Sequence, residues 1–437
     1  MFENIIGQDA VLQLRDDIVS GCSAPSILFF GPGESGKGSA ALELARIHSC
    51  EEKAEWKCVC PSCGKHRYLQ HEDLLVLGPR SFSAEISACS AAFYNAAFLK
   101  NTNTQSAKLL FIRSVRKLML RFSPVLMEDD PKFSKISSVL QSLDEGLNEF
   151  WDKNNLEQAA AEKLNESIIK NAAILEKDGL SSLIQISHIR RASYWCRLAP
   201  SGKRKTLILE NAENMRDEAR NSLLKLLEEP PASVSIVLTA KRREAVMPTI
   251  LSRLRPYRFL KRDSESEKEV IRRVFQGSGE SVSDYLDSFL PQNTEKLYPL
   301  AAWFVVSLAR IAVISLKRKN NVKIPVFLNT LGERYALIAD NAGLPRCVKS
   351  AEIIKIIIAK SGNFEEDSFS KFMKICMDLS GSVTFSAEDP EVIAFNDILI
   401  KYINEAVTAV DILNINSNIV LESLLYKLKT AIRSQYG

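Results

Sequence analysis

Short apolar runs alternate with helical patterns in the first part of the chain. Residues 26–30, 205–209 and 234–238 are almost continuously apolar, as in strands buried on both faces of a parallel sheet. Residues 39–47 and 221–229 place their apolar side chains at helical spacing, and a Pro-Pro pair stops the second of these segments. This alternation predicts an α/β core with a parallel sheet.

Helical periodicity dominates the rest of the chain. The helical segments are 109–118, 133–150 and 156–175, then 264–275 and 281–290, and most of the chain from residue 297 onward. The spacing of Ser264 and Glu267 fits a capping box at the start of one of them. We therefore expect a helical insertion in the α/β core, followed by an all-α region.

Composition narrows the function classes only slightly. The chain has 437 residues, too many for one core, and its net charge of +4 does not by itself indicate nucleic-acid binding. The sequence contains no apolar stretch long enough to span a bilayer and no signal-peptide pattern, so we expect a cytoplasmic protein without membrane contact. Its nine cysteines then indicate a reducing compartment and metal binding rather than disulfides.

A glycine-rich loop at residues 31–39 is the first candidate site. Its sequence is Gly-Pro-Gly-Glu-Ser-Gly-Lys-Gly-Ser, and it lies between a predicted strand and a predicted helix. Gly31, Gly36 and Lys37 fit the phosphate-binding pattern G-x-x-x-x-G-K-[S/T], with Gly33 inside the loop. In such loops backbone N–H groups hold phosphate at a helix N-terminus, and the lysine meets the β and γ oxygens.

Two departures weaken the chemistry of this site. Gly38 stands where the pattern has a hydroxyl for Mg²⁺, and Ser39 is turned about 100° away along the helix. In P-loop ATPases the strand equivalent to residues 205–209 ends in Asp-Glu, whereas here it ends in Glu210-Asn211, and an amide cannot act as a base. We expect that ATP or ADP can bind at the loop, that Mg²⁺ binding is impaired, and that the chain has no ATPase activity of its own.

A cysteine cluster is the second candidate site, and its members are Cys50, Cys58, Cys60 and Cys63. Structural zinc takes four thiolates in a tetrahedron, and the Cys60-Pro-Ser-Cys63 knuckle supplies two adjacent ligands. The Cys58-Val-Cys60 spacing is tighter than usual, which leaves His48 or His66 as alternative ligands. No open coordination position is implied, so we expect a structural zinc ion without a catalytic role.

The order of these segments resembles the bacterial DNA polymerase III clamp-loader subunits, the AAA+ family of the gamma/tau and delta-prime chains. Residues 2–9, Phe-Glu-Asn-Ile-Ile-Gly-Gln-Asp, are similar to the N-terminal signature of that family, in which a four-cysteine module also follows the P-loop helix. Residues 223–231, Leu-Leu-Lys-Leu-Leu-Glu-Glu-Pro-Pro, are close to its most characteristic helix. Residues 414–425 are similar to its collar helix. The resemblance does not explain the segment between residues 80 and 182.

Departures from the family pattern resemble the delta-prime subunit more than the gamma/tau motors. Ser252-Arg253-Leu254 is similar to the family's Ser-Arg-Cys motif, and the resemblance implies that Arg253 acts as an arginine finger on a neighbour's ATP. It further implies a stator of the clamp loader in the polymerase III holoenzyme. Its partners would be the gamma/tau and delta subunits, with the sliding clamp and primer-template DNA met through the complex.

The predicted fold class is α/β plus all-α. We expect an AAA+ P-loop core over residues 1–260, a small helical lid over 261–296, and a helical collar for oligomerisation over 297–437. Within the core, the zinc module is expected at about 48–66 and the helical insertion at about 80–182.

Two other functions remain open from the sequence. The first is a gamma/tau-type motor that hydrolyses ATP with Ser39 and Glu210 in shifted roles. The second is an AAA+ adapter in DNA repair or stress responses that has no clamp partner. Magnesium-dependent turnover would favour the motor, and failure to co-purify with loader subunits would favour the adapter.

Overall fold

The computed structural model of the chain falls into two units, Met1–Leu290 and Pro291–Gly437, which are described separately. The described residues are 1–98, 104–128, 130, 133–152, 158–289, 297–305, 307–308, 344–345, 350–361, 369, 372–379, 390–411 and 415–436. Among them no helix has the length and apolar character needed to cross a membrane. The predicted division into core, lid and collar remains a prediction.

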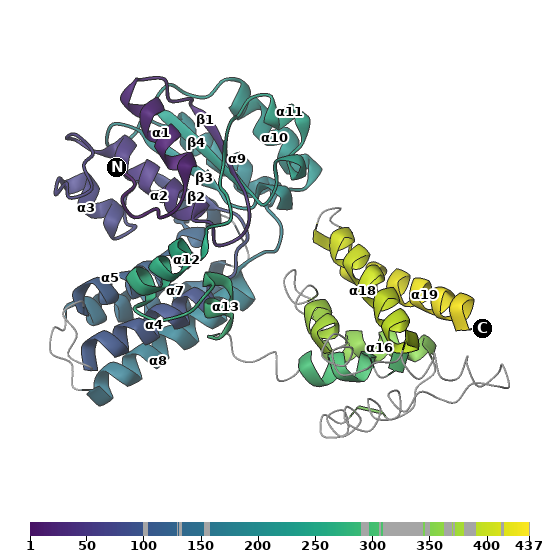
Figure 1. Cartoon of the computed structure of the whole chain (residues 1–437). Helices are drawn as coiled ribbons and strands as arrows, with labels where there is room; N and C mark the ends of the chain where they lie inside the picture. Colours follow the sequence, from purple (N-terminus) through teal and green to yellow (C-terminus); the bar gives the residue numbers. More distant parts are fainter. Residues whose placement is uncertain are drawn as a thin grey trace. The chain divides into compact units, whose positions relative to one another are not determined.

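The first unit is built on a five-stranded parallel sheet with the strand order β2-β3-β4-β1-β5 (Figure 1). The strands are β1 Ser26–Phe30, β2 Leu74–Leu77, β3 Lys205–Leu209, β4 Val234–Ala240 and β5 Arg255–Arg258. The predicted strands at 26–30 and 205–209 have the observed bounds, and the one at 234–238 extends two residues further. The parallel α/β sheet predicted from the apolar runs is therefore confirmed.

Helices cover both faces of this sheet, because side chains alternate along each strand. Ile27 and Phe29 of β1 pack with α1 (Asp9–Val19) and α2 (Lys37–Ser49). Leu28 faces the opposite layer. That layer is made by α9 Ile186–Arg197, α10 Asp217–Glu228 and α11 Pro248–Leu251. The sheet and the helices on its two faces form one three-layer core. The glycine-rich loop at residues 31–39 follows the carboxyl end of β1, and Glu210-Asn211 follows the carboxyl end of β3.

The insertion is helical, as predicted. Its elements are α4 Ser83–Phe98, α5 Thr104–Met119, the 3₁₀ turn Leu120–Phe122, α6 Pro124–Met127, α7 Phe133–Asp152, α8 Gln158–Ile174 and the π-helical turn Leu175–Gly179. The periodicity at 109–118, 133–150 and 156–175 corresponds to α5, α7 and α8. Helix α4 was missed because it is apolar on nearly all sides, so its sequence carries little 3.6-residue contrast.

The insertion and the predicted lid share one hydrophobic core. Helix α12 (Ser264–Val270), the π-helical turn Ile271–Phe275 and α13 (Val282–Asp287) place Ile271 and Phe275 among the aromatic side chains of α4, α5 and α7. The insertion is thus packed into the first unit together with the lid helices, rather than lying only on the core surface. The aromatic side chains of the insertion explain this packing, because a second apolar layer must cover them to remove them from water.

The start of α12 corrects one detail of the sequence analysis. Asp263 is its N-cap, and the Asp263 carboxylate accepts a hydrogen bond of 2.7 Å from the backbone N–H of Ser266. The predicted capping box that starts at Ser264 is therefore wrong by one residue. An aspartate is at least as good an N-cap as a serine, which explains the shift.

Apart from residues 344–345 and 415–416, the described residues of the second unit are helical. Its labelled helices are α16 Ser350–Ser361, α18 Pro390–Asp411 and α19 Ser417–Tyr436 (Figure 1). Apolar side chains of these helices and of residues 297–305, 308 and 372–379 contribute to one core, in which Phe304 and Phe372 meet at 5.7 Å between ring centroids. Residues 309–343 and Asn414 of the predicted collar lie outside the described residues.

Candidate nucleotide site and metal centre

The glycine-rich loop joins β1 to α2 in the conformation that its glycines permit. Gly31 has φ of +149°, and a Cβ atom there would lie 2.1 Å from the carbonyl oxygen of Phe259. Gly36 is the N-cap of α2 with φ of +96°, a left-handed conformation that other residues rarely adopt. A Cβ on Gly33 would meet no atom within 4 Å, so neither crowding nor backbone strain explains that glycine.

Lys37 is folded back onto its own loop. Its Nζ donates a hydrogen bond of 2.6 Å to the carbonyl of Gly31, another to the carbonyl of Pro32, and a longer one of 3.3 Å to Ser35 Oγ. The side chain is buried, and this burial lowers the pKa of Lys37 to about 8, although nearby carboxylates such as Glu213 oppose the shift. The lysine is therefore held at the loop by groups that a phosphate would have to replace.

Glu210 occupies the space beside Gly38. A Cβ atom on Gly38 would lie 2.5 Å from Glu210 Oε1, so the carboxylate fills the volume that a serine or threonine side chain would need. Glu210 follows β3 directly and is buried, with only 7% of its side chain exposed. Ser39 lies in the first turn of α2 and is partly exposed. The two positions at which the loop and strand depart from the P-loop pattern are therefore in contact.

The insertion supplies the cations that face Glu210. Arg121 Nη2 forms a buried ion pair with Glu210 Oε2, and Arg80 Nη1 lies 3.9 Å from Oε1. Arg80 also pairs with Glu85 at 2.5 Å, and Lys117 pairs with Glu85 as well. Burial alone would raise the pKa of Glu210, but the positive charges around it outweigh burial and lower that pKa, so the carboxylate is ionised.

Asn211 is used for structure. It adopts a left-handed conformation with φ of +52°, its Nδ2 donates a 2.7 Å hydrogen bond to the carbonyl of Pro79, and its backbone N–H donates to Thr239 Oγ1. The amide thus ties the end of β3 to the segment after β2. The amide side chain of Asn211 itself cannot act as a base.

Arg262 is a loop contact that the sequence analysis missed. Its Nε donates a 2.9 Å hydrogen bond to the carbonyl of Ile6, and its Nη1 donates to the carbonyl of Glu34 within the glycine-rich loop. It is buried and lies 4.0 Å from Glu267 of α12. The only sequence signal was its position just before the lid helices, which does not reveal that the side chain reaches the loop.

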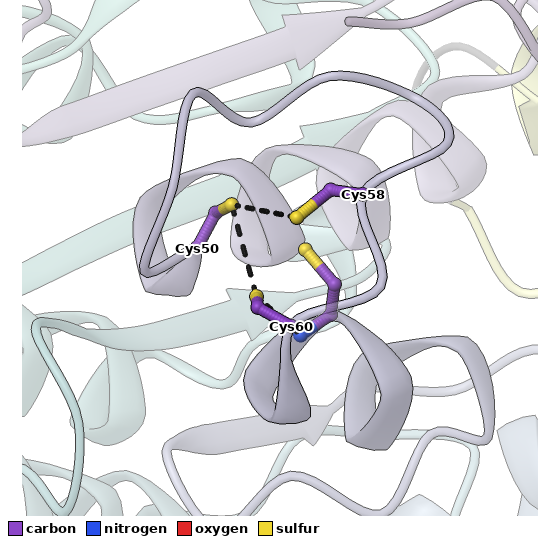
Figure 2. Close-up of side chains that lie close together, drawn as sticks. Cys50, Cys58 and Cys60 are labelled. Atoms are coloured by element: carbon purple, nitrogen blue, oxygen red, sulfur yellow. Dashed lines mark hydrogen bonds between the residues drawn. The ribbon is translucent and has the colours of Figure 1, made fainter.

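The four predicted cysteines converge, with their sulfur atoms all within 4.8 Å of one another. Figure 2 shows Cys58 and Cys60 pointing toward Cys50, whose Sγ lies 3.6 Å and 3.9 Å from theirs. Zn–S bonds of about 2.3 Å in a tetrahedron place sulfurs about 3.8 Å apart, so this donor set fits zinc. Neither His48 nor His66 belongs to the group, although both were alternatives from the sequence.

The cysteines are positioned by two helix ends and by one buried arginine. Cys50 follows α2, and Cys60 is the N-cap of α3 (Pro61–Arg67), where its Sγ accepts from the backbone N–H of Cys63. Arg46 of α2 pairs with Glu43 at 2.7 Å and donates a 3.0 Å hydrogen bond to Cys63 Sγ. Burial raises the pKa of Cys60, but hydrogen bonds to its sulfur outweigh this and lower it to about 7.

Arg253 lies at the surface after α11. Its guanidinium donates to the carbonyl of Thr249 at 2.6 Å, to Ser252 Oγ at 3.2 Å and to Glu228 Oε1 at 2.6 Å. One third of the side chain is exposed, and Glu228 is half exposed. The structure therefore holds the predicted finger residue in one orientation without burying it.

The fold and these sites together define a class of protein. A parallel α/β core with a glycine-rich loop, a four-cysteine module and a helical C-terminal region is the architecture of AAA+ clamp-loader subunits. A family model described as "DNA polymerase III, delta subunit" matches residues 7–126 and 144–263, more than half of the chain. The chain belongs to this family. The match includes most of the insertion, which the motifs alone had left unexplained.

Individual relatives match over short stretches. The delta-prime subunit of DNA polymerase III from Pseudomonas aeruginosa is 35% identical over 81 residues, which is 18% of this chain and 25% of that protein. An uncharacterized protein of Mycoplasma pneumoniae is 38% identical over 58 residues, which is 13% of this chain and 23% of that protein. The chain thus spans about a quarter of the length of the curated relatives it matches.

One solved structure is similar over nearly its whole length. It is a gamma subunit-related DNA polymerase III protein of Thermotoga maritima, which is 14% identical, with 97% of this chain and 99% of that chain covered. The TM-score is 0.34.

Proposed function

We propose that the chain is a delta-prime-type subunit of the DNA polymerase III clamp loader whose own nucleotide site does not hydrolyse ATP. It would assemble with gamma/tau and delta subunits in the cytoplasm, and the complex would place the sliding clamp on primer-template DNA. The observation that carries this proposal is the buried Arg121–Glu210 pair beside Gly38. A carboxylate that is already paired with a guanidinium is poorly suited to order Mg²⁺, and Asn211 supplies no base.

The role proposed for Arg253 is that of an arginine finger acting on a neighbouring subunit. A guanidinium near the γ-phosphate offsets the charge that develops during phosphoryl transfer. Arg253 is exposed enough to reach a partner, and its pair with Glu228 keeps the side chain extended from the end of α11. In a complex, the γ-phosphate of the neighbour would take the place of Glu228 as the anion that Arg253 meets.

The zinc ion and the second unit have structural roles in this proposal. Zinc bound by the four thiolates would hold the loop between α2 and α3 against the core, with no open position for chemistry. The helices of the second unit would form the collar that joins the subunits. Neither role requires nucleotide turnover by this chain.

The test is ATP hydrolysis by the assembled complex that carries Arg253→Ala. Removing an arginine finger costs about 10³ to 10⁵ in turnover at the site it serves, so the DNA-stimulated rate should fall by the share of that one site. The DNA-stimulated rate of the Arg253→Lys complex should fall similarly, because lysine lacks the planar guanidinium with its two parallel donors. Arg243→Ala is the matched control, since Arg243 is exposed in a nearby turn. An unchanged rate in a fully assembled Arg253→Ala complex would show that Arg253 does not act as an arginine finger.

The partner of Arg253 offers a second check. Glu228→Gln removes the carboxylate that holds the guanidinium and leaves the finger itself intact. We expect the hydrolysis rate of the complex to be unchanged or higher, because the phosphate no longer competes with Glu228. A loss as large as that of Arg253→Ala would mean that the pair matters for structure, and that neither residue acts as a finger.

A further inference from the structure

Gly38 and Glu210 share one volume. Glutamate is one methylene longer than the aspartate of the usual strand end, and its carboxylate reaches to 2.5 Å from where a Cβ of residue 38 would lie. Glycine at position 38 and glutamate at position 210 therefore fit each other. A serine at 38 with the glutamate retained would force the carboxylate out of its place.

Arg121 is fixed against Glu210 from several sides. Besides the ion pair, its Nε donates to the carbonyl of Gly78 at 3.3 Å and its Nη1 to the carbonyl of Lys117 at 3.1 Å. Its guanidinium lies 5.1 Å from the centre of the Phe82 ring. Only 4% of the Arg121 side chain is exposed. A guanidinium with its donors used in this way is a preorganised positive charge rather than a mobile surface group.

The charges of Arg121 and Arg80 lie beside the two groups that flank a metal ion in a P-loop site. Arg121 pairs with Glu210 Oε2, and Arg80 Nη1 lies 3.5 Å from where a Cβ of residue 38 would be. In a P-loop site, Mg²⁺ is held between the hydroxyl after the lysine and the carboxylate at the end of the second strand. Here the hydroxyl is absent at Gly38, and the carboxylate of Glu210 is bound by Arg121. Because the turn that carries Arg121 belongs to the insertion, whose core includes the lid helices, the guanidinium cannot leave without moving that packed layer.

We propose that Gly38, Glu210 and Arg121 form one unit in which a guanidinium from the insertion takes the place of Mg²⁺ at the glycine-rich loop. A nucleotide that enters the loop would meet Arg121 and Arg80 instead of a metal ion, so its binding gains nothing from magnesium. This inference deepens the proposed function and rests on it, because it assumes a loop that does not hydrolyse ATP. It does not depend on Arg253 or on any partner subunit.

The experiment is a titration of the purified full-length chain with a fluorescent ATP analogue, once in EDTA and once in excess Mg²⁺. For the wild-type protein we expect the analogue to bind with the same affinity in both buffers. No binding in either buffer would overturn the proposal, because no nucleotide would then meet the guanidinium groups. Binding about ten-fold or more tighter in Mg²⁺ would overturn the proposal.

A triple variant provides the positive arm. Gly38→Ser, Glu210→Asp and Arg121→Gln together restore the hydroxyl, shorten the carboxylate and remove the internal cation. This variant should bind the analogue at least about ten-fold more tightly in Mg²⁺ than in EDTA. Arg116→Gln is the matched control from α5, the helix that precedes the turn of Arg121. Arg116 donates to the Tyr68 carbonyl, so its loss should leave the wild-type result unchanged. If the triple variant folds but binds the analogue equally in Mg²⁺ and in EDTA, the proposal that these three residues replace the magnesium ion is wrong.

A stability cycle covers the case in which the triple variant does not fold. Gly38→Ser alone should lower the melting temperature, because the new side chain meets Glu210, and Glu210→Asp added to it should recover part of the loss. An unchanged melting temperature for Gly38→Ser would contradict the shared volume.

Failure of this inference can be distinguished from failure of the proposed function. Magnesium-dependent binding without hydrolysis rejects only this unit, whereas magnesium-dependent hydrolysis by the chain alone rejects both.

Discussion

The two metal-related sites of this chain depart from their patterns in opposite ways. The cysteine module has an unusual Cys58-Val-Cys60 spacing, yet its four sulfurs still converge within 4.8 Å. The glycine-rich loop keeps Gly31, Gly36 and Lys37, yet the place of its metal holds a buried ion pair between Glu210 and Arg121. Spacing along the chain is therefore a weaker guide to metal binding than the balance of charge around the ligand atoms.

Charge balance explains the difference. Only Cys63 of the cluster accepts a hydrogen bond from Arg46, and with a dication bound the four cysteines would supply four negative thiolate donors. At the loop, one carboxylate faces Arg121 directly and Arg80 at 3.9 Å, so a dication would add positive charge to a region that is already balanced. The predictions below test this contrast, beginning with the largest expected effect.

Loss of the zinc ligands should have the largest effect. The wild-type chain should hold one zinc ion, and Cys63→Ser should lose it together with about 4–5 kcal/mol or more of the free energy of unfolding, because metal binding is coupled to folding. Cys22→Ser is the control, since Cys22 is exposed and lies outside the cluster. Metal analysis and urea unfolding give the two readouts. A Cys63→Ser protein with full zinc content and unchanged stability would contradict a four-cysteine site.

Breaking the internal ion pair should rank second. Arg121→Met leaves Glu210 buried without its main partner, and we expect a loss of about 3–5 kcal/mol in the free energy of unfolding. The double variant Arg121→Met with Glu210→Gln should recover most of that loss, because it leaves no buried carboxylate without its main partner. Urea unfolding measures both. If Arg121→Met is as stable as the wild-type protein, then Arg121 does not balance the charge of Glu210 at the loop.

The pH dependence of stability should show the burial of Lys37. Its pKa in the folded chain is about 8, below the ordinary 10.5, so between these values the unfolded chain binds more protons. Stability should therefore rise with pH in this window, by up to about 1.4 kcal/mol per unit relative to Lys37→Met, which has no group to titrate. Urea unfolding of both proteins at pH 7.5 and 9.5 gives the difference. A difference that stays constant or falls would contradict the lowered pKa of the buried Lys37.

The surface pair should have the smallest effect on stability. Arg253→Ala removes an ion pair that is about one third exposed, so the free energy of unfolding should change by about 1 kcal/mol or less. Arg121 and Arg253 are thus opposites: the first should matter for folding, and the second for the activity of a complex. Thermal unfolding of the isolated Arg253→Ala chain is the measurement. A loss as large as that of Arg121→Met would make Arg253 a structural residue.

Local patterns were sufficient for much of the fold and part of the sites. The strands at 26–30 and 205–209 are continuous apolar runs, and the four cysteines lie close in sequence, so chain proximity alone brings them together. Arg121 could not be predicted, because its contact with Glu210 joins residues 89 positions apart and depends on how the insertion packs. Arg262 reaches the loop across 228 positions for the same reason.

The insertion shows where periodicity gives no signal. Helix α4 is apolar on nearly all sides because it lies between α5, α8 and the lid helices, so no polar face marks it in the sequence. The coupling of Gly38 to Glu210 was also hidden. Each residue alone looks like a defect of the phosphate loop. Only the 2.5 Å between Glu210 Oε1 and the place where a Cβ of residue 38 would lie shows that one fills the space left by the other.

The most direct test of the account is the rate of ATP hydrolysis by the purified chain alone in excess Mg²⁺. The place of the metal is taken by Arg121, and Asn211 provides no base, so we expect a rate no higher than that of a buffer control, and Lys37→Ala should not change it. Magnesium-dependent turnover that Lys37→Ala abolishes would contradict the account and identify the chain as a motor subunit.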